Sequence, residues 1–286
     1  MGLHCKRRHG RRENTGSRKP RAPGPACAKA RPFQLLSQLR HADARFTLQN
    51  GLQDLRLLSK LQRFLLRTPT TEIRRHGEIA SLVSTEHFVV EHDNGCAVLQ
   101  LVSPDGTNKL GMSRIIALHR IVDELKIEAE TCRIKALLIT GNDKFFSAGA
   151  DLNEIAQLSG RRAFAFSRAG QALMLAIDQF PVPVIAAVRG YCMGGGMDLA
   201  LACDYRIAAP DAVFGHRGAS LGLMTGWGGT QRLPRLIGRA RAMQMFLLAE
   251  MVAADEALKI GLVDAISDDP ITHAVRSFRG VDDRWR

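Results

Sequence analysis

From about residue 86 onward, short apolar runs alternate with longer segments in which apolar residues recur every three or four positions. Runs of the first kind predict buried strands, and segments of the second kind predict helices. Strands are expected at 87–91, 96–102, 134–140, 182–188, 205–208, 212–214 and 262–266. Helices are expected at 112–129, at 152–180 with a break at Ser159-Gly160, and at 197–203, 239–249 and 256–260. The alternation favours an α/β fold.

The segment Ile185–Tyr205 combines a buried strand, three glycines and a helix. Gly194, Gly195 and Gly196 cost the start of that helix conformational entropy, so they need a reason. Glycines let a partner approach bare backbone, where the free N–H groups of a first helical turn favour negative charge. Asp198 lies three residues after Gly195, on the same side of that turn. An N–H donor beside a carboxylate suits polarisation of a carbonyl with proton transfer, and a glycine-rich turn packed on a neighbour is the alternative.

A second strand, Ala136–Thr140, ends in the same kind of loop. Gly141 follows this strand, and Phe145–Leu152 then has the sequence F-F-S-A-G-A-D-L before the next helical segment. Each of two such loops can supply one backbone N–H, and an oxyanion hole uses two donors. The two segments together favour an oxyanion hole over a merely structural turn.

Three motifs resemble, in order and spacing, those of the crotonase superfamily of enoyl-CoA hydratases and isomerases. They are F-S-A-G-A-D from Phe146, G-Y-C-M-G-G-G-M-D-L-A-L-A-C-D-Y from Gly190, and G-W-G-G-T-Q-R-L-P-R-L-I-G from Gly226. The resemblance covers residues 86–266. It implies a crotonase-like spiral of ββα repeats, a shortened C-terminal helical region and a homo-oligomer, either a trimer or a hexamer.

By motif position, the resemblance assigns the oxyanion hole to the backbone N–H groups of Ala150 and Gly195, which would bind the thioester oxygen of an acyl-CoA. Asp198 falls on the first of the two family glutamates and is the expected acid–base residue. No metal is implied, and no cofactor beyond the coenzyme A of the substrate. The expected substrate-binding positions are Ser147, Ala148, Gly149, Asp151, Gly194, Gly196, Gly218 and Trp227.

The chain departs from the family where a second carboxylate is expected. That position falls on Gly218, and the third acid of the dienoyl-CoA isomerase branch falls on Gly226. His216 is a candidate catalytic replacement because an imidazole titrates near neutral pH, although a structural histidine is the simpler interpretation. Its neighbour Arg217 is expected to meet a phosphate, a carboxylate or solvent. Trp227 stands where the family often has a small residue, and it would narrow the acyl end of the pocket if it points inward.

The expected activity is that of an enoyl-CoA hydratase/isomerase-like enzyme, a lyase or isomerase of fatty acid metabolism, with Asp198 as the remaining acid or base. An acyl-CoA decarboxylase or hydrolase of the same fold is the first alternative, because it depends on the oxyanion hole more than on a second carboxylate. A catalytically weak relative that binds acyl-CoA or RNA is the second.

The positive charge of the chain is confined to its N-terminal part. Residues 1–85 hold 18 Lys and Arg against 5 Asp and Glu, whereas residues 86–286 hold 22 against 23. The composition of residues 1–32 predicts disorder, and leucines between positions 52 and 65 form a helical stripe. The extension 1–85 is interpreted as a tail without function, a mitochondrial targeting segment or a nucleic-acid-binding arm, in that order. No aromatic interleaving supports the last interpretation, so no nucleic-acid partner is expected.

The remaining composition indicates a protein of the cell interior. No apolar run is long enough to span a membrane, so no membrane association is expected. The expected location is the cytoplasm, or the mitochondrial matrix if residues 1–85 form a targeting segment. Residues 267–286 form a short C-terminal tail, where the family continues with helices that close the coenzyme A pocket. The cysteines lack C-x-x-C spacing, which predicts reduced thiols at Cys5, Cys27, Cys96, Cys132, Cys192 and Cys203.

Overall fold

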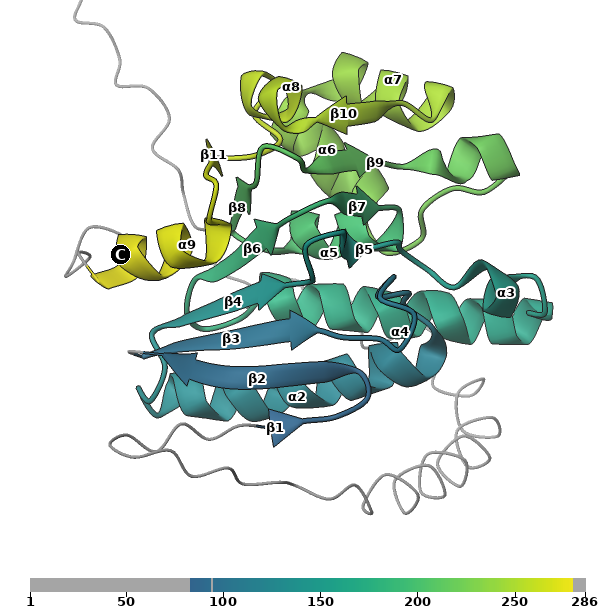
Figure 1. Ribbon diagram of the computed structural model, residues 1–286. Helices are drawn as coiled ribbons and strands as arrows, with labels where there is room; N and C mark the ends of the chain where they lie inside the picture. The colour runs from purple at the N-terminus through teal and green to yellow at the C-terminus, as the bar shows by residue number, and fades with distance from the viewer. Residues whose placement is uncertain (1–82, 94, 280–286) are drawn as a thin grey trace, which may run out of the picture. The chain divides into compact units, whose positions relative to one another are not determined.

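The computed structural model describes residues 83–93 and 95–279 (Figure 1). The interpretations made for residues 1–82, including the charged extension and the leucine stripe, lie outside these described residues. Asn94, between the first two predicted strands, lies outside them as well. Within the described ranges, no helix has the length and apolar character needed to cross a membrane.

Two sheets form the framework of the described residues. The larger has the strand order β1-β2-β3-β4-β6-β8-β11, and the smaller has the order β10-β9-β7-β5. The strands of the larger sheet are β1 (Val83–Ser84), β2 (Phe88–Asp93), β3 (Cys96–Leu101), β4 (Ala136–Thr140), β6 (Val184–Val188), β8 (Tyr205–Ala208) and β11 (Ala265–Ile266). Those of the smaller sheet are β5 (Phe145–Ser147), β7 (Tyr191–Met193), β9 (Val213–Gly215) and β10 (Met251–Ala253). β2 and β3 form an antiparallel hairpin, and the larger sheet is parallel from β3 to β11.

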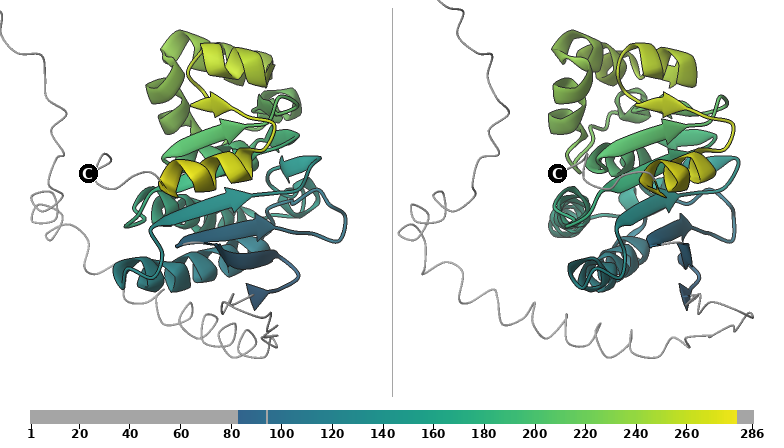
Figure 2. Two further views of the ribbon diagram at one scale, coloured as in Figure 1. Left: turned by 60° about the vertical axis from the view of Figure 1, so that its left-hand side comes forward. Right: turned by 90° about the vertical axis from the view of Figure 1, so that its left-hand side faces the viewer.

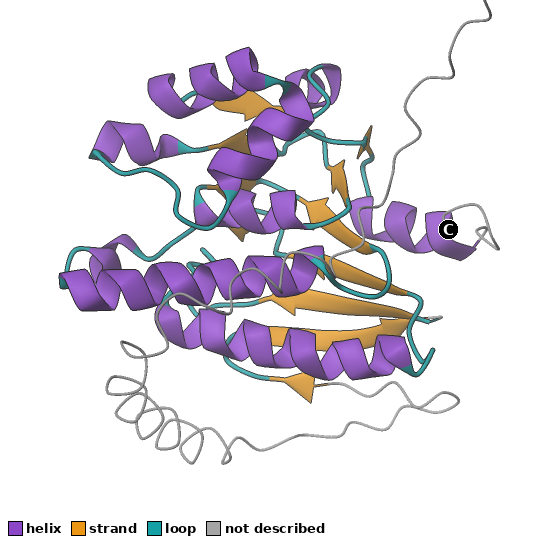
Figure 3. Cartoon of the chain, turned by 180° about the vertical axis from the view of Figure 1, so that it is seen from behind, coloured by secondary structure: helices purple, strands orange, loops and turns teal. Residues whose placement is uncertain are grey.

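Two long helices cover one face of the larger sheet. Seen from behind, α2 and α4 run side by side across the strands (Figure 3). Their buried residues, such as Leu118 and Leu173, share one apolar core with the strand residues Leu99 and Leu137. The helices are α2 (Met112–Glu130), α3 (Leu152–Ile155), α4 (Gly160–Asp178), α5 (Gly195–Ala202), α6 (Gly229–Ile237), α7 (Arg239–Leu248), α8 (Ala254–Lys259) and α9 (Pro270–Arg279), with the 3-10 helix η1 (Arg217–Leu221).

The chain repeats a ββα unit in three successive turns, which confirms the crotonase-like spiral. In each unit a strand of the larger sheet is followed by a strand of the smaller sheet and then by helix. β4, β6 and β8 pair in parallel in the larger sheet, while β5, β7 and β9 pair in parallel in the smaller one. The carboxyl ends of the short strands therefore lie at one edge, beside the starts of the helices that follow them.

The apolar pattern does not predict strands β5 and β7 or helix α6. β5 and β7 have three residues each, which is too short to show a period of two. α6 begins at Gly229 and contains Pro234, and both residue types lower helix propensity. These elements form because they pair or pack with distant parts of the chain.

Helix α9 lies where residues 267–286 were interpreted as a tail (Figure 2). Its residues Ala274 and Val275 are buried against the strand residues Leu138 and Ile185. Because side chains alternate across a strand, these strand residues face away from α2 and α4. The tail interpretation is therefore corrected for residues 270–279, which cover the second apolar face of the parallel sheet, as such sheets require.

Candidate active site

Two loops, each at the end of a short strand, come into contact. The first runs from β5 through Gly149 and Ala150 into α3, and the second runs from β7 through Gly194 into α5. Gly149 (φ +90°) and Gly194 (φ +51°) have left-handed backbone conformations, which favour glycine. A Cβ on Gly149 would lie 2.9 Å from the backbone N of Gly195, and a Cβ on Gly195 would lie 3.2 Å from the backbone N of Ala150. The absence of side chains at these positions is what allows the two loops to meet.

The N–H groups of Ala150 and Gly195 are not used by the fold. Neither donates a hydrogen bond to a described residue, whereas the N–H of Gly194 donates to the Gly215 carbonyl at 2.8 Å. Gly195 begins α5, so its N–H is one of the unsatisfied donors of a first helical turn. Ala150 and Gly195 both line the same cavity. The structure thus brings together the two donors that the motif positions indicated.

Four of the expected substrate-binding residues support these loops and do not line the cavity. Ser147 Oγ donates to the carbonyl of Asn108 at 2.7 Å and accepts the N–H of Gly149 at 3.1 Å. The carboxylate of Asp151 caps α3 by accepting N–H groups of its first turn. A Cβ on Gly196 would lie 2.6 Å from the Cβ of Ser147, so this glycine permits close packing of α5 on β5.

The cavity has a volume of about 490 Å³, with a buried floor and an exposed apolar rim. Asp198, His216 and Trp227 form the floor and are 1%, 4% and 4% exposed. Leu152 and Met224 belong to the rim and are 51% and 56% exposed. The size and the mixture of apolar walls with a few polar groups are those of a small-molecule site. The expected substrate-binding residues that line the cavity are Ala148, Gly194, Gly218 and Trp227.

Asp198 and His216 form a buried acidic and basic pair at the cavity floor. Asp198 Oδ1 lies 3.3 Å from His216 Nε2, and neither atom makes a hydrogen bond among the described residues. Asp198 Oδ2 accepts a hydrogen bond from Thr225 Oγ1. The His216 ring packs on Phe246 with a centroid separation of 5.1 Å. One oxygen of Asp198 and one nitrogen of His216 are therefore buried without a hydrogen bond among the described residues, and such unsatisfied buried atoms are uncommon outside functional sites.

Sequence reasoning missed two residues that shape this pair. Thr225 orients the Asp198 carboxylate, and Gly229 leaves space beside it, because a Cβ there would lie 2.1 Å from Asp198 Oδ1 and 2.9 Å from His216 Nε2. The glycine-rich segment that begins at Gly226 was the available signal for Gly229. Nothing in the local pattern marks Thr225, whose role depends on the folding of its loop onto α5.

The position of the second family carboxylate has no room for a side chain. A Cβ on Gly218 would lie 2.7 Å from the carbonyl oxygen of Leu223, and the N–H of Leu223 donates to the Gly218 carbonyl at 2.8 Å. The neighbouring Arg217 is exposed. His216 is thus the ionisable side chain that the structure places against Asp198.

Trp227 points into the cavity, which is the orientation in which it would narrow the acyl end of the pocket. Its ring packs on Phe166 with a centroid separation of 5.2 Å. A Cβ on Gly195 would lie 2.2 Å from the indole, which shows how closely this ring approaches the backbone of the candidate oxyanion donor. The indole therefore occupies space directly beside the point where the two loops meet.

Three buried cysteines near these strands have no reactive character. Burial raises the pKa of Cys96 to about 11 and that of Cys203 to about 12. Burial also raises the pKa of Cys192, which lies in β7 just before the glycine loop, and the nearby charges of Cys203 and Asp198 act in the same direction. Since the thiolate is the reactive form, these side chains act as apolar core groups.

The ββα spiral, the two converging N–H groups and the buried carboxylate beside them define a protein of the crotonase type. The sequence model of the family described as enoyl-CoA hydratase/isomerase matches residues 91–278. The chain belongs to this family.

Relatives within the family share about a third or more of the aligned residues. A crotonyl-CoA hydratase from Syntrophomonas wolfei is 40% identical over 182 residues, which cover 63% of this chain and 69% of the relative. A short-chain-enoyl-CoA hydratase from Clostridium acetobutylicum is 35% identical over 181 residues, covering 63% of this chain and 68% of the relative.

Solved structures show the same fold. Pseudomonas aeruginosa DspI has a TM-score of 0.64 and 36% identity, covering 71% of this chain and 76% of that protein. An enoyl-CoA hydratase from Bacillus anthracis has a TM-score of 0.62 and 32% identity, covering 68% of this chain and 74% of that protein.

Proposed function

We propose that this chain binds an acyl-CoA thioester and acts as an enoyl-CoA hydratase/isomerase-like enzyme. The observation that carries the proposal is the pair of unused N–H groups of Ala150 and Gly195, which line one cavity beside the buried carboxylate of Asp198. Relatives named as crotonyl-CoA and short-chain-enoyl-CoA hydratases support the same substrate class.

The two N–H groups would stabilise the thioester oxygen as it gains enolate character. Both belong to rigid loops with glycine at the points of contact, so the donors are held in place before the substrate arrives. Preorganised donors of this kind are worth about 3 kcal/mol of barrier each. The apolar cavity walls strengthen the interaction because they exclude water.

Asp198 would transfer the proton at the carbon next to the thioester. Thr225 binds one carboxylate oxygen and leaves the other facing the cavity floor next to His216. Because Gly218 has no side chain, His216 is the second group that we assign to acid–base chemistry, as the acid or base that the family's second carboxylate would otherwise supply.

Hydration of crotonyl-CoA and solvent deuterium exchange at the α-carbon test this assignment. Asp198→Asn should lower both rates by a factor on the order of 10²–10⁴. His216→Gln should lower hydration while leaving measurable exchange, because exchange needs only the group at the α-carbon. Exchange by Asp198→Asn at the parental rate would show that Asp198 is structural. Equal hydration by His216→Gln and the parent would remove His216 from the mechanism.

An acyl-CoA decarboxylase or hydrolase is the second candidate, and the empty position at Gly218 favours it. Such reactions need the oxyanion hole but not a second carboxylate. Malonyl-CoA and saturated acyl-CoA thioesters distinguish these activities from hydration, since neither probe has the double bond that hydration requires. Binding of these probes and of crotonyl-CoA without turnover of any of them would indicate the catalytically weak relative instead.

A homo-oligomer, trimer or hexamer, is also proposed. Large apolar side chains are exposed on α7, including Met243, Leu247 and Leu248, and contacts between subunits would cover such residues. Light scattering coupled to size-exclusion chromatography measures the mass directly. A monomer at micromolar concentration would contradict the proposal.

A further inference from the structure

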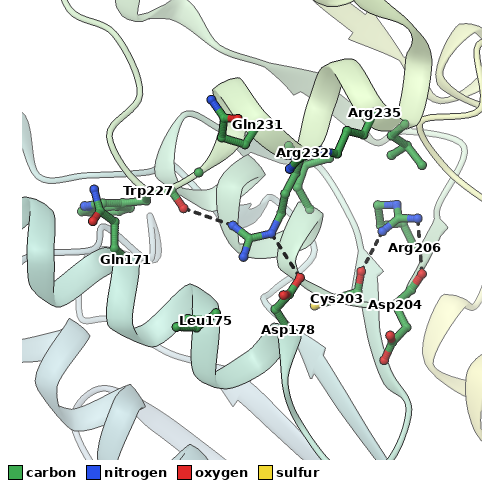
Figure 4. A pocket seen from close by; sticks show the side chains of 13 residues that line it. Gln171, Leu175, Asp178, Cys203, Asp204, Arg206, Trp227, Gln231, Arg232 and Arg235 are labelled. Atoms are coloured by element: carbon green, nitrogen blue, oxygen red, sulfur yellow. Dashed lines mark hydrogen bonds and ion pairs between the residues drawn. The ribbon is translucent and has the colours of Figure 1, made fainter. Parts of the chain in front are cut away.

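A second cavity, of about 610 Å³, has Trp227 in its lining (Figure 4). Trp227 is the one described residue that lines both cavities. Three segments line the two cavities in the same order along the chain. From α4, Phe166 and Ser167 line the first cavity, and Gln171 and Leu175 line the second. From α5, Gly195 and Asp198 line the first cavity, and Leu201 lines the second. From the loop before α6 and from α6 itself, Thr225 and Gly226 line the first cavity, and Gly228, Gln231 and Arg232 line the second. The two cavities are therefore consecutive, with the indole between them.

The indole spans the space between two helices that both present glycine to it. A Cβ on Gly195 of α5 would lie 2.2 Å from Cζ3 of Trp227, and a Cβ on Gly170 of α4 would lie 2.2 Å from Nε1. Glycine inside a helix lowers its stability, so Gly170 has a packing reason to be there. Gln171 Nε2 also donates to the Gly226 carbonyl at 2.8 Å, next to the indole. We call Trp227, Gly170 and Gly195 the partition, because the indole fills the space between the two glycines and separates the two cavities.

The partition lies at the closed end of the first cavity. The rim residues are largely exposed, whereas Trp227, Asp198 and His216 at the floor are nearly inaccessible. If the thioester oxygen is bound by Ala150 and Gly195, the bulky polar part of coenzyme A has to leave through the open rim. The free end of the acyl chain is then directed toward the floor. Beyond the indole, the second cavity is lined by leucines and by charged side chains, among them the Arg232–Asp178 ion pair. The apolar space that a longer chain would gain without the indole is therefore chiefly the space of the ring itself.

We infer that Trp227 ends the acyl pocket and restricts this enzyme to short-chain acyl-CoA thioesters. The inference rests on the proposed acyl-CoA function. Trp227 then determines the length of the acyl chain that the enzyme accepts. A larger side chain at Gly170 should fill the same space when Trp227 is replaced.

The experiment compares crotonyl-CoA with trans-2-decenoyl-CoA for three proteins: the parent, Trp227→Ala, and Trp227→Ala combined with Gly170→Leu. The parent should prefer crotonyl-CoA. Trp227→Ala should raise the ratio of kcat/KM for decenoyl-CoA over crotonyl-CoA at least tenfold, since each newly buried methylene contributes about a factor of four. The double variant refills the space from the opposite helix and should return the ratio toward the parental value. Calorimetric binding of butyryl-CoA and decanoyl-CoA gives the same comparison without catalysis.

Several outcomes separate this inference from the proposed function. Equal kcat/KM of the parent for both enoyl-CoA probes overturns the inference and leaves the function intact. Tighter parental binding of butyryl-CoA than of decanoyl-CoA, with no turnover of either enoyl-CoA probe, supports the inference and overturns the proposed reaction. A Trp227→Ala protein that is folded by circular dichroism but keeps the parental ratio also overturns the inference. If that variant does not fold, Trp227→Leu provides the comparison, and it should shift the ratio in the same direction by a smaller factor.

Discussion

Ala150 and Gly195 serve the candidate site through backbone atoms, so the informative substitutions are those that remove an N–H. Gly195→Pro is a poor choice, because any Cβ at this position meets the indole of Trp227. Ala150 is better suited. Its N–H takes part in no hydrogen bond with a described residue, while the adjoining bridge to Leu110 uses the Gly149 carbonyl and the Asp151 N–H.

Ala150→Pro should therefore reduce turnover far more than it reduces stability, because proline lacks the N–H. Loss of one oxyanion donor is expected to lower kcat by a factor on the order of 10²–10³. The matched control is Ala150→Ser, which keeps the N–H and should retain most of the activity. Steady-state hydration of crotonyl-CoA and thermal unfolding are the measurements. Parental kcat in a folded Ala150→Pro protein would remove this N–H from the oxyanion hole.

Gly218→Glu should destabilise the protein and should not add hydratase activity, although motif position alone would place a useful carboxylate there. The new Cβ would meet the Leu223 carbonyl at 2.7 Å, and relief requires the loop to move. Overpacking of this kind costs about 1–3 kcal/mol. Ser220→Glu, at an exposed position of the same 3-10 helix, is the control. It loses only the exposed hydrogen bond from Ser220 Oγ to the Arg217 carbonyl, so it should change stability by less than about 1 kcal/mol. Chemical denaturation checks both, and a stable Gly218→Glu variant with faster hydration would contradict the expectation.

At the scale of elements, α9 shows how a short segment gains its structure from a sheet. Leu138, Ile185 and Ile207 form an apolar surface on the face of the larger sheet that α2 and α4 do not cover, and Ala274 and Val275 of α9 are buried against it. Short helices have little stability of their own in water, so burial of this apolar face is what stabilises α9.

Ala274→Asp should consequently lower the free energy of unfolding by about 2–4 kcal/mol, because it buries a charge in an apolar contact. Arg276→Gln changes an exposed residue of the same helix and should have an effect within about 0.5 kcal/mol. Urea denaturation followed by circular dichroism measures both. Equal midpoints for the two variants would mean that α9 does not contribute to the stability of the sheet.

At the scale of the whole molecule, the net charge of the described residues differs from that of the residues before them. The positive excess lies in residues 1–85, and residues 86–286 are nearly neutral. β1 begins at Val83 and pairs with β2, so the fold already includes residues just before Glu86. A separation of composition as sharp as this one is typical of a segment that the fold does not need.

A chain that begins at residue 80 should keep the unfolding temperature of the full-length protein and its crotonyl-CoA turnover. Any salt-dependent binding of RNA should be lost with the removed lysines and arginines, because phosphate contacts release counterions. Thermal unfolding, hydration assays and RNA binding at two salt concentrations test these statements together. Failure of the shortened chain to fold would show that residues before 80 belong to the same cooperative unit.

The amino-acid sequence by itself determined the longer strands and helices, the glycine positions in both loops and the spacing from Gly195 to Asp198, because these depend on local periodicity and local backbone geometry. Tertiary structure decided the rest. His216 and Thr225 meet Asp198 only through the folding of a distant loop. Trp227 closes the cavity only because Gly170 and Gly195 leave room for its ring. A side chain at Gly218 has no space only because the Leu223 carbonyl lies against that position. Strands of three residues and helix α9 also depend on partners far away in the chain. Distances between such segments are set by packing of the whole core, which no local pattern of residues specifies.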